Sequence, residues 1–133
     1  MTQPIPDLWP EIEQSGEVPP VAILREQAAL LGHKTHNLLQ GRVDTRIAPG
    51  GLFVHSFYIV APTLDNYIYK LFEIEHGVNP YPVVSDEQQF YKAPAPLRLK
   101  SEQDLLHHVR EILNSDQTKR ILGSLLAQVK ATS

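Results

Sequence analysis

The chain has 133 residues, no cysteine and a formal net charge of −3. That length predicts one domain with its own core, and the lack of cysteine excludes disulfides and thiolate chemistry. The slightly acidic balance offers no basic face for nucleic acid or anionic lipid. No apolar stretch reaches the roughly 20 residues of a spanning helix, and the first residues do not resemble a secretory signal. We therefore expect a cytoplasmic protein that binds neither nucleic acid nor membrane.

Residues 1–20 form a proline-rich arm, and residues 21–133 form a single α+β domain in this interpretation. The arm holds five of the eleven prolines and the only tryptophan, Trp9. Proline fixes its own φ and favours extended backbone in the residue before it, so the arm should be extended. Two alternatives follow for Trp9. It anchors the arm over the domain, as buried tryptophans do, or it docks on a partner or a second subunit.

The first helix is expected to begin after Pro19-Pro20 and to end at Gly41, where glycine is a favoured stop. Ile23 and Leu30 lie outside its main apolar stripe and widen its apolar surface. The stripe comprises Val21, Leu24, Ala28, Leu31, Thr35, Leu38 and Leu39.

Three strands at residues 42–48, 52–60 and 67–75 follow, because the apolar period changes from helical to two. The second strand is apolar on both faces, which predicts a central position or contact with a second subunit. In the third strand, strict alternation places Glu73 and Glu75 on one face together with Tyr67, Tyr69 and Leu71.

The segment 76–99 is broken by glycine and proline, and only Tyr81–Val84 and Gln89–Lys92 are expected as short strands. Pro82 would confine its strand to a sheet edge. Ser101 and Ser115 then precede amphipathic segments and are expected to cap two helices. The predicted fold is α+β: an N-terminal helix, an antiparallel meander of three to five strands, and two C-terminal helices packed on the sheet.

One chemical hypothesis rests on Glu73, Glu75 and His76, where two carboxylates on one strand face would hold a divalent metal or act as an acid/base pair. Asp44 or Asp65 would supply a third ligand. The helix-then-meander order is similar to the front half of the restriction-type nuclease core. However, the third strand offers Glu73-Ile-Glu75 instead of that family's Glu-x-Lys, and Gly51-Leu52 opens the second strand without its acidic residue. A further alternative is a small-ligand pocket around His55 and the tyrosines.

The function that the sequence favours is a non-enzymatic protein-interaction module, either a homodimer or an accessory subunit, with no cofactor and no bound metal. Its basis is surplus apolar surface, which on proteins in water marks contact sites. The alternative is a small metal-dependent hydrolase or nuclease that uses Glu73, Glu75 and His76. The residues expected to bind protein are Trp9, Ile23, Leu30, Phe53, Phe57, Leu122 and Leu126.

Overall fold

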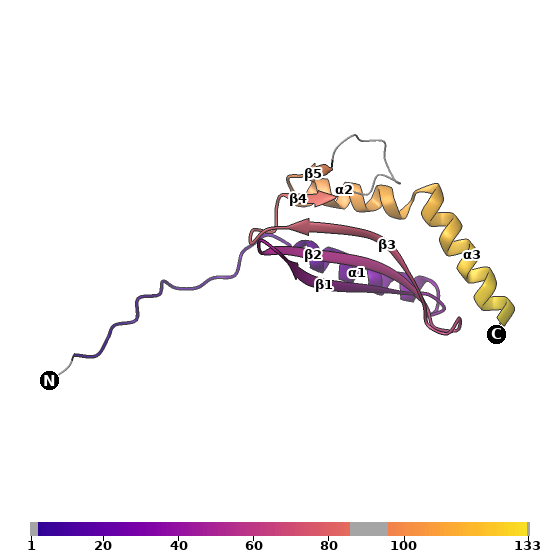
Figure 1. Ribbon diagram of the computed structural model, residues 1–133, viewed down its shortest axis with the longest axis horizontal. Helices are drawn as coiled ribbons and strands as arrows, with labels where there is room; N and C mark the ends of the chain where they lie inside the picture. The colour runs from indigo at the N-terminus through magenta and orange to yellow at the C-terminus, as the bar shows by residue number, and fades with distance from the viewer. Residues whose placement is uncertain (1–2, 86–95, 133) are drawn as a thin grey trace.

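The computed structural model describes residues 3–85 and 96–132 and shows one antiparallel sheet with three helices (Figure 1). The elements in chain order are α1 (Pro20–Lys34), β1 (Gln40–Ala48), β2 (Leu52–Ala61), β3 (Tyr67–His76), β4 (Val83–Ser85), β5 (Leu97–Leu99), α2 (Glu102–Leu113) and α3 (Asp116–Thr132). The expected α+β fold with a meander and two C-terminal helices is confirmed. None of these helices is both long enough and apolar enough to cross a membrane.

The strands pair in sequence order, β1-β2-β3-β4-β5, so β1 and β5 are the two edges. One contiguous core joins the sheet to all three helices, through residues such as Leu24 of α1, Phe57 of β2, Val109 of α2 and Val129 of α3. The helices therefore lie on one face of the sheet, and the opposite face carries no described helix. We call these the helix face and the open face.

A β-bulge in β3 changes which of its side chains meet the helices. Phe57 pairs with Phe72, but the next residue of β2, Tyr58, pairs with Lys70, so Leu71 is an extra residue. The insertion reverses the alternation beyond it. Tyr67 and Tyr69 therefore share the helix face with Phe72, while Glu73 and Glu75 lie on the open face. The strict alternation expected from the sequence was wrong at this point because a bulge is a property of the paired strands.

Helix α1 ends at Lys34, seven residues before the glycine that was expected to stop it. His36 and Asn37 take positive φ values of 50° and 63°, and they turn the chain into β1. Gly41 instead lies in β1 against α1. A Cβ built there would lie 2.4 Å from the Cα of Ala28. The residue is glycine because the helix backbone occupies the space of a side chain.

The segment after β3 differs from the expectation in two ways. Pro82 lies just outside β4, so its missing N–H does not interrupt the ladder, and β4 is an inner strand between β3 and β5. The edge is β5, which the sequence did not indicate. The strand expected at Gln89–Lys92 lies outside the described residues.

Both predicted helix caps are present. Ser101 Oγ accepts a hydrogen bond from the Asp104 amide at 3.2 Å, and Ser115 Oγ accepts one from the Thr118 amide at the same distance. Each bond satisfies a donor that the first turn of a helix leaves without a partner in the helix. The local cap signals therefore placed the starts of α2 and α3.

The arm extends away from the domain, and every residue from Gln3 to Pro19 is exposed (Figure 1). Its base is held where the Tyr81 hydroxyl donates a hydrogen bond of 2.8 Å to the Val18 carbonyl. The expectation that Trp9 anchors the arm over the domain was wrong, because its side chain is 78% exposed.

The contact between α1 and β1 leads to a paired test on two glycines. Gly41→Ala should lower the free energy of unfolding by about 1–3 kcal/mol, the usual cost of overpacking. Gly123→Ala, in α3, has nothing within 4 Å of the added Cβ and should raise stability by about 0.5–1 kcal/mol. Urea denaturation measures both. A neutral Gly41→Ala variant would contradict the close contact.

Candidate functional site

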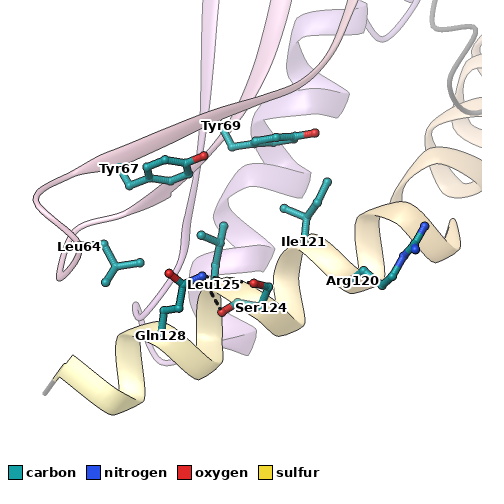
Figure 2. A pocket seen from close by; sticks show the side chains of 8 residues that line it. All are labelled: Leu64, Tyr67, Tyr69, Arg120, Ile121, Ser124, Leu125 and Gln128. Atoms are coloured by element: carbon teal, nitrogen blue, oxygen red, sulfur yellow. Dashed lines mark hydrogen bonds between the residues drawn. The ribbon is translucent and has the colours of Figure 1, made fainter.

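A groove between β3 and α3 is the first candidate site (Figure 2). Its volume is about 470 Å³. Tyr67 and Tyr69 form one wall, and Ile121 and Leu125 point toward their rings from α3. The remaining lining residues are Leu64, Arg120, Ser124 and Gln128.

The chemistry of the groove suits an apolar side chain with a neighbouring negative charge. Of its eight described lining side chains, five are aliphatic or aromatic, and Arg120 is the single charged residue among the eight. The Gln128 amide already donates to the Ser124 hydroxyl at 3.2 Å, so the polar rim is partly engaged. Such a lining can bind a ligand by burying its apolar surface and can orient it through one cation. Among the eight described side chains, no nucleophile has an adjacent base.

A smaller crevice of about 240 Å³ lies between α1 and the α2–α3 junction. It brings together three of the residues expected to bind protein, Leu30, Phe57 and Leu122. Leu30 is 38% exposed at its rim, whereas Phe57 is buried at its base. Phe57 therefore serves the core.

The other expected protein-binding residues are scattered. Ile23 is buried in the core, and Leu126 packs partly buried against it. Phe53 is half-buried, with its ring stacked on that of His76 at 5.3 Å between centroids. Among the expected residues, Trp9 alone is almost wholly presented to solvent.

The residues Glu73, Glu75 and His76 do not converge on one site. Glu73 and Glu75 pair with Ser56 and Val54 on the open face, while His76 pairs with Phe53 on the helix face. Lys70 and Ser56 contact the Glu73 carboxylate at 3.1 and 3.0 Å. Burial alone would raise the pKa of Glu73, but hydrogen bonds from these two residues keep that pKa below its usual range. Glu73 is thus held as an ionised partner of cations.

No group of three or more His, Asp or Glu side chains arranged to hold a metal occurs in residues 3–85 and 96–132. Neither Asp44 nor Asp65 joins Glu73 and Glu75 in such a group. Asp44 is instead paired with Arg42, whose Nη2 lies 2.8 Å from its Oδ2.

A pair of histidines that the sequence did not connect lies on the helix face, where β2 meets the end of β3. The Nε2 atoms of His55 and His76 are 2.8 Å apart. Thr45 Oγ1 lies 2.8 Å from His55 Nδ1, and His76 Nδ1 lies 2.7 Å from the Gly77 carbonyl oxygen. A carbonyl only accepts, so His76 Nδ1 carries a proton. His55 Nε2 then donates to His76 Nε2, and the Thr45 hydroxyl donates to His55 Nδ1.

At a separation of 2.8 Å, only one of the two facing Nε2 atoms can carry a proton, because two N–H groups would otherwise point at each other. Burial, then the nearby His76 and Arg25, lower the pKa of His55 to about 4. His55 is thus a neutral, buried structural histidine at physiological pH.

The expected ligand pocket around His55 and the tyrosines is not formed as one site. His55 is 2% exposed, Tyr67 and Tyr69 line the groove with α3, and Tyr58 lies on the open face with Arg42 5.6 Å from its ring centroid. Arg120, Ser124 and Gln128 were not among the residues expected from the sequence to form a site. Their i, i+4 and i+8 spacing places them along one side of α3, and this is the signal that would have found them.

Comparisons with protein-family models, with curated proteins and with solved structures find no match to this chain.

The buried His55 should make the folded protein less stable as the pH falls. Because the pKa of His55 is about 4 when folded and near 6.5 when exposed, the unfolded chain binds more protons between these values. Folding stability should therefore fall by about 2 kcal/mol from pH 7 to pH 5 through this group.

Urea denaturation of the parent and of His55→Gln at both pH values measures that contribution. The variant should lose less stability on acidification than the parent, even if it is less stable at pH 7. His33→Gln, at an exposed position of α1, is the matched control and should keep the parent's slope. Equal slopes for the parent and His55→Gln would show that His55 is not buried in its neutral form.

Proposed function

We propose that this protein is a non-enzymatic, cytosolic interaction module that binds a partner protein through its arm, residues 3–19. The observation that carries the proposal is the exposure of four large apolar side chains within eight residues. Ile5, Leu8, Trp9 and Ile12 are 78–89% exposed. Single exposed apolar residues are ordinary, but a cluster of this kind is typical of a contact segment.

The arm is suited to binding because its backbone is already restricted. Pro4, Pro6 and Pro10 limit the conformations between and around the apolar residues, so less entropy is lost when the segment docks. Burial of each Leu, Ile or Trp side chain is worth roughly 1.5–3 kcal/mol before those losses. Three or four such side chains are therefore enough for a specific contact.

The charge of the arm defines the complementary surface. Residues 1–20 contain Asp7, Glu11, Glu13 and Glu17 and no lysine or arginine. Two of these carboxylates flank Leu8-Trp9-Pro10. The partner should therefore offer an apolar pocket with basic side chains at its rim, because opposite potentials steer association and fix the register.

The β3–α3 groove has this chemistry, but the arm leaves the domain from the other end (Figure 1). Nine residue steps lead from Trp9 to Val18, which Tyr81 holds beyond the C-terminal end of β3. At about 3.1 Å per step they span about 28 Å, whereas the nine steps from Tyr67 to His76 along β3 span about 30 Å. An arm of this length does not place Trp9 inside the groove of its own chain. We therefore infer that the arm binds another protein.

The test compares the parent with an arm variant, Leu8→Ser/Trp9→Ser/Ile12→Ser. Each is purified with a C-terminal tag from the native source and weighed intact by native mass spectrometry. The parent should carry a stoichiometric partner, and the variant should bind that partner at least about tenfold more weakly. Thermal unfolding should be unchanged, because these side chains make no core contacts.

Val78→Ser is the matched control, since Val78 is 86% exposed but lies outside the arm. It should retain the partner. Trp9 is the only tryptophan, so blue-shifted emission on adding the purified partner reports docking directly. A partner retained by the arm variant would contradict the proposal, as would a parent that carries none. A blue shift with concentration in the protein alone would place the arm on a second copy instead.

A further inference from the structure

We infer that β1 is a self-complementary edge that pairs antiparallel with β1 of a second copy, placing Asp44 of each chain opposite Arg46 of the other. This pairing involves neither the arm nor its partner. The length of the edge, the geometry of antiparallel pairing and the order of charges along the strand support it.

The two edges of the sheet are unequal. Strand β5 has three residues, whereas β1 has nine, and no described strand pairs with the outer side of β1. An edge of this length presents a row of unpaired N–H and C=O groups that another strand can complete. Ile47 at this edge is 61% exposed. The strand includes no proline, and proline would have been the simplest way to block such pairing.

Antiparallel geometry limits the possible registers. Opposite residues must both direct their backbone polar groups toward the partner strand or both direct them away. These two kinds of residue alternate along a strand. Two copies of β1 therefore pair only in registers in which the numbers of any two opposite residues add up to an even number.

Charge and burial select one of these registers. Centring on Asp44 places Arg42 against Arg46 and Asp44 against itself, and centring on Arg46 places Arg46 against itself. Like charges directly opposite each other are unfavourable. Centring on Thr45 places Asp44 opposite Arg46 twice and Val43 opposite Ile47 twice. Centring on Val43 also pairs opposite charges, Arg42 with Asp44, but it leaves Ile47 beyond the paired strand.

The charges already present on the open face extend this pairing. Arg42 is held on Asp44 at 2.8 Å, and Arg46 Nη2 lies 3.6 Å from Glu73 Oε1. If the β1 strands of two copies pair, side chains of opposite charge follow one another across the junction between the copies. The order is Glu73, Arg46, and then Asp44 and Arg42 of the second copy. The side chains of Arg46 and Asp44 are 63% and 47% exposed, so both are accessible to a second chain.

The helix beneath β1 leaves room for this arrangement. One flank of α1 lines the crevice with Gln27, Leu30 and Lys34. The helical period places Ala22, Arg25 and Ala29 on the opposite flank, toward the β1 edge. All three are exposed. Because two of them are alanines, Arg25 is the only large side chain among these three that would lie between the α1 helices of two copies under the joined sheet.

Charge reversal with complementation tests the register by sedimentation equilibrium at low ionic strength. The parent should be a dimer. Asp44→Arg and Arg46→Asp should each weaken it by about tenfold or more, because each sets like charges opposite each other twice. An equimolar mixture of the two variants should restore a dimer, composed of one chain of each, because both pairs are then complementary. Glu111→Arg on α2, which is also exposed, is the control and should leave the dimer unchanged.

Three results would overturn the inference: a monomeric parent at concentrations of about 100 μM, a dimer insensitive to both reversals, or rescue of Asp44→Arg by Arg42→Asp and not by Arg46→Asp. If a reversal variant unfolds, Ile47→Lys provides the same test, because its exposed side chain is not needed by the monomer. That variant should be folded and monomeric, and a dimer as strong as the parent's would refute the pairing. None of these measurements involves the arm, so they are separate from the proposed partner.

Discussion

The β2–β3 ladder is the interaction on which the rest of this structure depends, and the extra residue Leu71 is its critical detail. From His76 to Phe72, alternation directs the carboxylates of Glu73 and Glu75 to the open face. Beyond the bulge it directs Tyr67 and Tyr69 to the helices. Without this insertion, the tyrosines would share a face with the glutamates. One wall of the groove against α3 therefore exists because one residue of β3 has no partner in β2.

The second constraint is that the helices cover only one face of the sheet. All three helices contribute to a single core, and a β-sheet that is buried on one side keeps a polar surface on the other. On the open face, Arg42, Asp44 and Arg46 of β1 run parallel to the Lys70 and Glu73 side chains of β3. A meander in sequence order also leaves its first strand at an edge. The longer of the two described sheet edges thus lies beside an alternating row of charges.

The histidine pair illustrates how a buried polar group is tolerated. Each ring nitrogen of His55 and His76 has a partner, and in the described residues no buried side-chain nitrogen or oxygen lacks one. A neutral His55 ring avoids the cost of burying a charge. Histidines in a small domain thus serve here as internal hydrogen-bond bridges between β1, β2 and the end of β3.

The sequence by itself determined the presence and order of α1, of the first three strands and of α2 and α3, together with the starts of α2 and α3. Apolar periodicity and serine caps act over a few neighbouring residues, so a linear pattern contains them. Only the tertiary structure decided that α1 stops at Lys34, that Gly41 contacts Ala28, that β3 bulges at Leu71, and that His55 meets His76 across 21 positions. These features depend on strand register and on contacts between distant segments. A residue's neighbours in the chain do not encode them, because the partner that imposes each one lies elsewhere in the sequence.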